Sequence, residues 1–527
     1  MSSWPHWMIM PVVLPLLCGA LLILLERNRP AWAPWLSVAS LLALVGLSTH
    51  LLIAADSGEI GVYLLSNWRA PFGIVLVLDR LSALMLLLSN LLGLACALHA
   101  LGGDAQRGAH FHALLQFQLM GLNGAFLTGD LFNLFVFFEV LLIASYGLLL
   151  HGGGAARLRA AIHYVSFNLA ASALFLIAVG LLYGLTGTLN MADLALRVAA
   201  LEAEQLLLAK SAALLLLVVF SVKAALLPLY FWLPATYASA SSSVAALFAL
   251  MTKVGIYAIA RVFTLIFGAS AGLMAEPAGS WLAILALATL VLGSLGALAA
   301  EHLRGQIAYL LVASAGTLLL AIGLGSPGAL AAALSYLPGS TLACAALFLL
   351  AGQLSAARGS QADALQAAPF AYGRQRLGLL FFIAAIIVGG LPPLSGFIGK
   401  ALLLQASQTH ALMAWVWAGV LLSSLIVLLA LARAGSTLFW ASDDAPVPCS
   451  GPAPGVAAQL SCYALLALAI ASGVLAGPLY RYASASAAQL YAPQAYIDAV
   501  FAQDSAPARF DVRKEMREAG LSKGGAQ

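Results

Sequence analysis

Long apolar runs follow one another along almost the whole chain, and short polar segments separate them. An α-helix needs about 20 mostly apolar residues to cross the hydrocarbon core of a bilayer. About 14 runs approach this length, so the pattern predicts an all-α integral membrane protein. The predicted spans are 8–25, 35–54, 81–101, 112–128, 131–150, 162–185, 207–227, 239–263, 281–299, 307–324, 330–351, 377–404, 413–438 and 456–475.

The composition excludes several other classes of protein. Of the 527 residues, 63% are hydrophobic and only 8% are charged, whereas soluble domains carry about 25% charged residues. The net charge of +4 is spread over many loops, which argues against nucleic-acid binding. The chain has no glycine-rich nucleotide fingerprint and no CxxC pair, so we predict no cofactor and no metal site.

Loop charges predict the orientation, because cytoplasmic loops of membrane proteins carry an excess of Lys and Arg. This excess would put both termini on the outer side of a bacterial inner membrane. The stretch 479–501 is less hydrophobic and is predicted to be interfacial, and the charged tail after 505 is predicted to be disordered. The arginines on the predicted cytoplasmic side are Arg27, Arg29, Arg107, Arg157, Arg159, Arg304, Arg358, Arg374, Arg376 and Arg433, against Arg69, Arg80, Arg197 and Arg261 opposite.

Four ionisable residues stand inside or at breaks in apolar spans: Glu139, Lys223, Lys253 and Lys400. Each such charge costs about 2.5–3.5 kcal/mol on insertion scales, so a chain that keeps them needs partners, water or a function. A buried lysine can lose its proton near neutral pH, whereas arginine cannot. We therefore interpret the four as proton carriers, against the alternatives of a structural carboxylate and of lysines that reach the interface.

Two of the lysines lie beside helix breakers. Lys223 precedes Pro228, whereas Lys400 follows Pro392, Pro393 and Gly396. Proline removes a backbone donor and opens a helix, and open backbone at membrane depth is tolerated only where it is buried or lines water. Paired broken helices of opposite order are typical of transporters built from inverted repeats, with ion sites at the breaks.

Histidines are weaker candidates for the same chemistry. His163 opens a predicted span, and His302 lies near the start of another. Imidazole titrates close to neutral pH, so both are candidate relay residues. An interfacial position without a role in transfer is the alternative for each.

Four segments resemble the antiporter-like subunit family that respiratory complex I, membrane-bound hydrogenases and Mrp/Pha-type cation/proton antiporters share. They are GDLFNLFVFFEVLLIASYGLLL, FSVKAALLPLYFWLPATY, ALMTKVGIYAIARVF and GGLPPLSGFIGKALLL. The early segment NWRAPFGIVLVLDRLSALMLLLSN looks most like the D subunits of the Mrp/Pha/Mnh antiporters. The resemblance extends over nearly the whole chain.

The resemblance implies a fold of 14 transmembrane helices with two inverted five-helix repeats, each with a broken helix. In this numbering, 1–106 would hold helices 1–3, 107–263 the first repeat, 264–440 the second, and 441–527 the last helix, an interfacial segment and the tail. The resemblance also implies that Glu139 and Lys223 form an ion pair controlling proton transfer. Lys253 would bridge toward Lys400, which lies on the path to one surface.

One stretch departs from the family pattern. Relatives often carry one or two histidines and a lysine where this chain has LSYLPGSTLACAALFLL, with Gly339, Ser340 and Cys344 at those places. The second half therefore lacks part of the usual relay, and water or His302 would have to replace it.

The resemblance predicts a secondary transporter subunit, not an enzyme. The predicted function is proton translocation in a multisubunit Na+/H+ or K+/H+ antiporter, with other membrane subunits as partners. Two alternatives remain at this point: a proton-pumping subunit of a redox complex, such as an NADH:quinone oxidoreductase or a hydrogenase, and a structural membrane scaffold.

Overall fold

The structure of the protein is a computed structural model, which describes residues 6–28, 31–441 and 455–502. The predicted disordered tail lies outside the described residues. The described chain is mostly helical, as predicted, with one short β-hairpin. The elements are α1 (Met10–Asn28), α2 (Ala33–Asp56), β1 (Gly61–Leu64), η1 (Leu65–Asn67), β2 (Val75–Leu78), α3 (Arg80–Ala100), η2 (Asp104–Arg107), α4 (Phe111–Leu127), α5 (Leu131–Leu150), α6 (Ala155–Thr186), α7 (Met191–Ala199), η3 (Ala203–Gln205), α8 (Leu206–Ala224), α9 (Trp232–Ser239), α10 (Ser242–Phe248), α11 (Met251–Leu265), η4 (Gly272–Met274), α12 (Trp281–Ala299), α13 (Leu303–Gly323), α14 (Pro327–Arg358), η5 (Gly359–Gln361), α15 (Arg374–Gly389), α16 (Ser395–Ala406), α17 (Met413–Gly435), η6 (Ser436–Trp440), α18 (Val456–Val474), α19 (Ala476–Leu490) and α20 (Pro493–Phe501).

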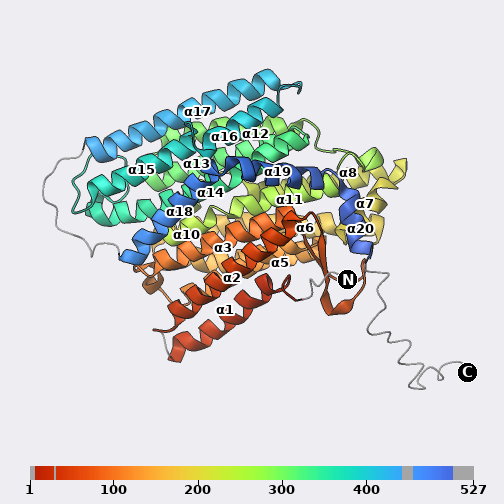
Figure 1. Cartoon of the computed structure of the whole chain (residues 1–527), viewed down its shortest axis with the longest axis horizontal. Coiled ribbons are helices and arrows are strands. Elements are labelled where there is room, and N and C mark those ends of the chain that lie inside the picture. The colour runs from red at the N-terminus through yellow and green to blue at the C-terminus, as the bar shows by residue number, and fades with distance from the viewer. Residues whose placement is uncertain (1–5, 29–30, 442–454, 503–527) are drawn as a thin grey trace, which may run out of the picture.

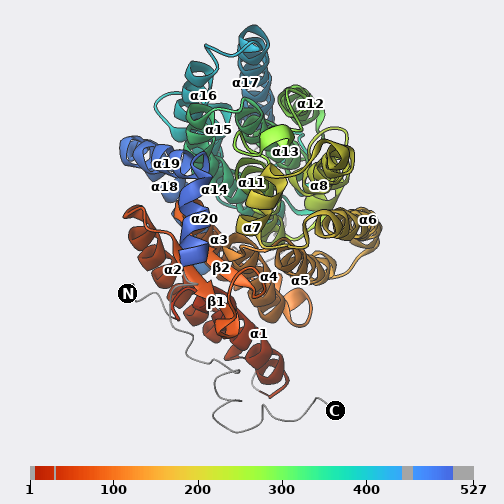
Figure 2. The same ribbon diagram turned by 90° about the vertical axis from the view of Figure 1, so that its right-hand side faces the viewer.

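The long helices run side by side as one bundle (Figure 1). Seen from the end, α1 and α2 lie at one edge, α16 and α17 at the opposite edge, and α11, α13 and α14 between them (Figure 2). The antiparallel β1–β2 hairpin contacts α20, which also contacts α7, and these elements gather at one end of the bundle (Figure 1). This end is the one at which α3 and α5 begin.

Within the described residues, 11 helical segments are long and apolar enough to cross a membrane. The shorter α1 is also apolar. Two of the predicted spans are not among these: 112–128 corresponds to α4, and 377–404 is divided between α15 and α16. The predicted total of 14 therefore includes α1, α4 and this divided helix, and it stays a prediction.

Small residues let α12 and α13 approach closely. A Cβ atom added to Gly293 of α12 would lie 2.6 Å from the backbone nitrogen of Ala313, and one added to Gly316 of α13 would lie 2.5 Å from that of Leu290. Such contacts between backbones are how helices associate in a membrane, where burial of apolar surface provides little drive.

Two helices are interrupted where the sequence predicts breaks. α8 ends at Ala225, which has a left-handed conformation (φ 60°), and α9 begins only after Pro228. Side chains satisfy the backbone groups that this break frees: the Leu227 N–H donates to Thr289 Oγ1 at 2.9 Å, and Trp232 Nε1 donates to the Val222 carbonyl at 3.1 Å. Open backbone at membrane depth requires such partners.

The second break separates α15 from α16. α15 ends at Gly390, whose left-handed φ of 80° glycine adopts readily, and Pro392 and Pro393 follow in the exposed connection. Gly396 is buried against the Ile387 carbonyl, and an added Cβ there would overlap with it.

The stretch that is predicted to be interfacial forms α19 and α20. α19 packs against α14 and α3 and buries Ala483, Ser486, Ala487 and Leu490. It follows α18 with a single intervening residue, Leu475, and lies along the bundle (Figure 1).

Candidate functional site

All three lysines predicted to carry protons lie at helix interruptions. Lys223 is in the last turn of α8, Lys253 is in the first turn of α11 just after α10 ends, and Lys400 is in α16 after the second break. Lys223 and Lys253 are buried, with exposed fractions of 7% and 0%, and Lys400 is half-buried. A helix C-terminus favours a nearby cation, so interrupted helices suit these side chains.

Glu139 and Lys223 are both held by α6. The Ser172 hydroxyl donates to Glu139 Oε1, and Lys223 Nζ donates to Asn168 Oδ1 at 3.0 Å. Asn168 and Ser172 are four residues apart, so they lie on one face of α6. Asn168 is buried against α8, whereas Glu139 on α5 is half-buried.

The predicted ion pair between Glu139 and Lys223 is not closed. No ion pair within 4 Å joins them among the described residues, although they are near enough to interact electrostatically. A cavity of about 10 Å³ beside Lys223 is lined by Tyr164 and Asn168, and about this volume holds one water molecule. The acid and the base are thus near each other but separately satisfied.

Lys253 has a sparser environment. Its Nζ donates to Thr252 Oγ1 at 3.2 Å. The buried Cys344 of α14 is near enough to interact electrostatically with Lys253. The structure therefore places Cys344, one of the residues that departs from the family pattern, beside the second lysine.

Lys400 lies between two cavities. Its Nζ donates to the Gly389 carbonyl, at the end of α15, at 3.4 Å. On one side is a cavity of about 20 Å³ with the hydroxyls of Ser314, Thr317 and Tyr336 in its wall, and on the other a cavity of about 370 Å³. Hydroxyl-bearing residues thus line the cavity beside Lys400, and Ser314 Oγ lies 3.4 Å from the hydroxyl of Ser340, one of the residues that departs from the family pattern.

The packing around Gly339 explains part of this departure. A Cβ atom at Gly339 would overlap with Ser395 Oγ of α16 and would lie 2.8 Å from Ser472 Oγ of α18. Two serines fill the space that a larger side chain would need. Ser340 and Cys344 are both buried.

The two candidate relay histidines lie at exposed positions. His163 is on α6, and His302 immediately precedes α13. Neither forms a hydrogen bond with Glu139 or any of the three lysines in the described chain. Within the same residues, no group of three or more His, Cys, Asp and Glu side chains is arranged to hold a metal ion.

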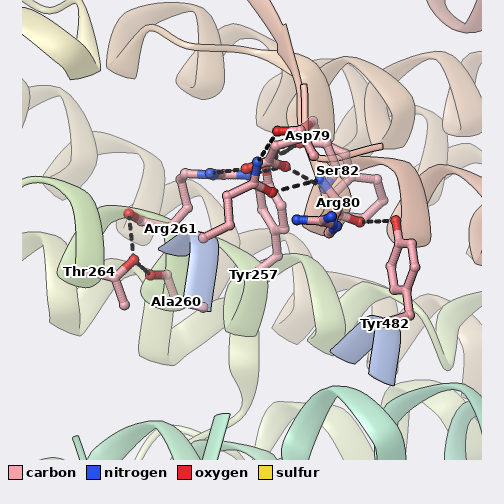
Figure 3. Close-up of polar contacts among 11 residues, drawn as sticks. Asp79, Arg80, Ser82, Tyr257, Ala260, Arg261, Thr264 and Tyr482 are labelled. Carbon is pink, nitrogen blue, oxygen red and sulfur yellow. Dashed lines mark hydrogen bonds and ion pairs between the residues drawn. The ribbon is translucent and has the colours of Figure 1, made fainter. Parts of the chain in front are cut away.

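Sequence reasoning missed a buried ion pair near the hairpin end of the bundle. Arg261 was expected at a loop, but it is only 4% exposed and binds Asp79 through two hydrogen bonds of 2.5 and 2.8 Å (Figure 3). Ser82 N–H donates to the same carboxylate at 2.9 Å. Asp79 directly precedes the apolar run of α3, which is the position of an N-cap and the signal that would have found it.

Sequence reasoning also missed Asn168 and Ser172, which hold the acid and the base. Together with Tyr164 they recur every four residues inside an apolar span. A polar stripe at this spacing lies on one helix face, and in a membrane it faces the protein interior. That spacing was the available signal.

An all-helical bundle with membrane-spanning helices, interrupted helices and ionisable groups buried at the interruptions defines a polytopic membrane protein of the ion-translocating class. The family described as NADH:quinone oxidoreductase/Mrp antiporter, transmembrane, matches residues 128–426. The chain belongs to this family.

Two relatives and one solved structure match this chain over almost its full length. The D subunit of a probable K+/H+ antiporter from Rhizobium meliloti (strain 1021) is 44% identical, over 95% of this chain and 98% of the relative. The D subunit of a Na+/H+ antiporter from Bacillus subtilis (strain 168) is 37% identical, over 94% and 99%. A chain in the structure of the Mrp complex from Dietzia sp. DQ12-45-1b matches with a TM-score of 0.83 and 29% identity, over 94% of this chain and 99% of that one.

Proposed function

We propose that this chain is the D subunit of a multisubunit monovalent cation/proton antiporter and that it moves protons through Glu139, Lys223, Lys253 and Lys400. The observation that carries the proposal is the pair of bonds to α6, which hold a carboxylate and a buried ammonium near each other without joining them. The full-length match to antiporter D subunits supports the same function. This is the work of a transporter subunit and not of an enzyme.

The proposed mechanism is a switch between two partners for Lys223. A buried ammonium keeps its proton more readily beside a carboxylate than without one. When Glu139 pairs with Lys223, the lysine holds its proton; when Glu139 returns to Ser172, the proton moves toward Lys253. Water completes the path to Cys344 and on to the hydroxyl-lined cavity beside Lys400.

We propose the same internal organisation as the resemblance implies, with 14 spans and inverted repeats at 107–263 and 264–440. The breaks at α8–α9 and α15–α16 support it, because each repeat then contains one. His163 and His302 are secondary candidates for proton transfer at the two surfaces.

The chain is a multi-pass membrane protein, and we propose the bacterial inner membrane as its location, with both termini outward. The start and end of the described chain support this orientation, because His6 contacts Tyr63 of β1 and α20 contacts β1. Arg157 interacts electrostatically with both Arg107 and Arg304, so these predicted cytoplasmic arginines share one side.

We propose that the partners are other membrane subunits of the same antiporter. Glu139 is half-buried in the single chain, and an ionised carboxylate that faces lipid is costly. A neighbouring subunit over α5 would remove that cost. The cation is Na+ or K+, as the names of the two relatives suggest.

The test is exchange in everted vesicles from an antiporter-deficient bacterium that expresses the whole operon. Addition of sodium or potassium salts should collapse the acidic interior, and the salt that acts names the cation. Glu139→Ala should abolish exchange in complexes that assemble normally, and Glu59→Ala on the exposed turn after α2 is the matched control. Normal exchange by an assembled Glu139→Ala complex would contradict the proposal.

The redox alternative has the same family behind it. It predicts that the purified complex contains electron-transfer subunits and acidifies vesicles when a reductant is added, with no response to either salt. That outcome would replace the antiporter proposal.

A further inference from the structure

A large cavity lies at the surface of the bundle on the side of Arg107 and Arg304. It is a cavity of about 450 Å³ whose wall includes His99, Asp104, Arg107, Ser242, Arg304 and Ser355, and we name it the arginine vestibule. Arg107 has a 55% exposed side chain at the mouth, whereas His99 and Asp104 are each only 7% exposed. The volume is enough for several water molecules.

Inside the arginine vestibule, His99 and Asp104 are joined by one serine. Ser243 Oγ donates to Asp104 Oδ2 at 2.9 Å, and the same oxygen lies 3.0 Å from His99 Nδ1. The Ser243 N–H also donates to Asp104, at 3.2 Å. Because the serine hydroxyl can turn toward either neighbour, it can accept from a protonated imidazole while it donates to the carboxylate.

The other ring nitrogen of His99 is free to take up a proton. Nε2 has no hydrogen-bond partner of good geometry among the described residues, and the ring also faces the main-chain carbonyl of Leu349 on α14. A proton on Nε2 would meet that carbonyl, and Asp104 would balance the charge at 4.0 Å. The other titratable groups near this cluster lie on several elements. They are Arg107 on η2, Cys96 on α3, Arg157 on α6, His151, whose ring contacts the Asp104 carbonyl at 3.1 Å, and, across the cavity, Arg304 on α13.

His99 gives the arginine vestibule a group that takes up a proton and not an alkali cation, because imidazole titrates near neutral pH. The one carboxylate in its wall is already paired, since Arg107 contacts Asp104 at 3.4 Å and Ser243 donates to the other oxygen. Arg304 Nη2 donates to the hydroxyls of Ser242 and Ser355 at 3.5 Å and adds a second fixed positive charge. Fixed positive charges repel an alkali cation and an excess proton alike, so the selective step is proton uptake by His99.

Buried polar atoms without partners continue from Ser243 toward Lys223. The Ser241 hydroxyl and the Tyr237 hydroxyl are each 1% exposed and have no partner among the described residues. Tyr237 interacts electrostatically with Tyr164, which lines the cavity beside Lys223. An unpaired buried hydroxyl costs about 1–3 kcal/mol, so these two neighbouring hydroxyls indicate sites where water binds.

We propose that the arginine vestibule is the proton-loading site of the first half of the chain, with His99 as the acceptor and Ser243, Ser241, Tyr237 and Tyr164 as the route to Lys223. A proton passes from water to His99 Nε2, the Nδ1 proton passes to Ser243 Oγ, and the serine releases its own proton inward. His99 is then left with its proton on Nε2, and transfer of that proton to Nδ1 through water returns the imidazole to its first tautomer and resets the cluster. The inference rests on the proposed function, since it supplies protons to the same lysine.

The functional test is exchange in everted vesicles by the whole complex carrying His99→Gln. Glutamine can still bond to Ser243 but does not titrate. We expect exchange to fall about tenfold, which is less than the usual contribution of a positioned proton-transfer group because water in the vestibule substitutes in part. The pH dependence between about 5 and 8, where imidazole titrates, should also flatten. Exposed His50→Gln is the matched control, and Tyr237→Phe should slow exchange whereas exposed Tyr183→Phe should not.

A second measurement needs no exchange activity. Ser355→Cys places a thiol in the arginine vestibule, and the native cysteines among the described residues are buried. A membrane-impermeant maleimide should label the variant in everted vesicles and not in right-side-out vesicles, above the background of the parent complex. No labelling from either side would mean that lipid or a partner covers the vestibule, which overturns the inference.

The two proposals fail in different ways. A wild-type complex without exchange contradicts the proposed function. A wild-type complex that exchanges, together with an assembled His99→Gln complex of unchanged rate and pH profile, contradicts only the vestibule. If His99→Gln does not assemble, the labelling of Ser355→Cys decides.

Discussion

Two of the acid–base sets inside the bundle are built in opposite ways. Asp79 and Arg261 form a closed, two-pronged ion pair between α3 and α11, in which each group is at most 4% exposed (Figure 3). Glu139 and Lys223 stay apart, and each bonds instead to a neutral side chain of α6. Asp79 and Arg261 are already paired with each other. Glu139 and Lys223 can either keep their bonds to α6 or pair with each other.

The chemistry of the bases differs in the same direction. Arginine is always charged and its planar fork matches a carboxylate, so it suits a permanent contact. Arg261 also lies 5.5 Å from the ring centres of Tyr257 and Tyr496, which ties α20 to the pair. Lysine can release its proton when its partner changes. Charge inside this membrane protein therefore holds helices together at Asp79 and Arg261, and we propose that it carries protons at Glu139 and Lys223.

The largest expected effect is a loss of assembled complex when the Asp79–Arg261 ion pair is broken. Arg261→Met leaves a buried carboxylate without its partner, which costs about 3–5 kcal/mol, and should strongly reduce the amount of assembled complex in membranes. Replacing both partners, as Asp79→Leu with Arg261→Met, should restore most of it, because no unpaired charge is left. Gel filtration in detergent measures the amount of assembled complex for both variants. A double variant as defective as the single one would contradict a purely structural role for the ion pair.

A smaller effect, on the rate of exchange, is expected when the α6 bonds to Lys223 and Glu139 are removed. Asn168→Leu and Ser172→Ala each remove a hydrogen bond to a charged group, which is worth about 1.5–3 kcal/mol. Exchange by assembled complexes should therefore fall in both variants, with the outward-facing Ser211→Ala unchanged. Equal wild-type rates in both α6 variants would show that α6 does not hold the open arrangement.

The smallest expected effect is the pH dependence of the stability that the Asp79–Arg261 ion pair contributes. Burial acts to raise the pKa of Asp79, but the Arg261 guanidinium and the bonds from Ser82 hold it below its usual value. A carboxyl whose folded-state pKa is lowered adds stability above its unfolded pKa, about 3.9, and loses it as the pH falls through the folded value. Thermal stability in detergent should therefore not depend on this pair between pH 5 and 8. It should fall below about pH 4, and less so in the Asp79→Leu, Arg261→Met variant.

The fold was largely predictable because span length and hydropathy are local properties. The apolar runs became helices close to their predicted bounds. The prolines at 228, 392 and 393 marked the interruptions at α8–α9 and α15–α16, but no proline marks the one between α10 and α11. The extent of α14 was underestimated, since the prediction for 330–351 stopped short of Arg358. Arg358 is buried by bonds to the carbonyls of the following turn, which hydropathy does not register.

The site was predictable in its charged members but not in its contacts. Glu139 and the three lysines stand out because charge is rare in apolar spans. Asn168, Ser172 and Ser243 do not, since neutral polar residues are common in membrane helices and their importance comes from which charge they meet across the bundle. The buried position of Arg261 was missed for the same reason, because its partner Asp79 is 182 residues away in the chain.

Interchanging lysine and arginine at positions 223 and 261 tests whether proton release by Lys223 is needed for antiport. Lys223→Arg keeps the positive charge but cannot release a proton, and Arg261→Lys keeps a charge that can. Both whole complexes would be assayed for salt-driven exchange in everted vesicles and corrected for the amount assembled. We expect no exchange from Lys223→Arg and near wild-type exchange per complex from the less stable Arg261→Lys. Wild-type exchange by assembled Lys223→Arg would contradict it.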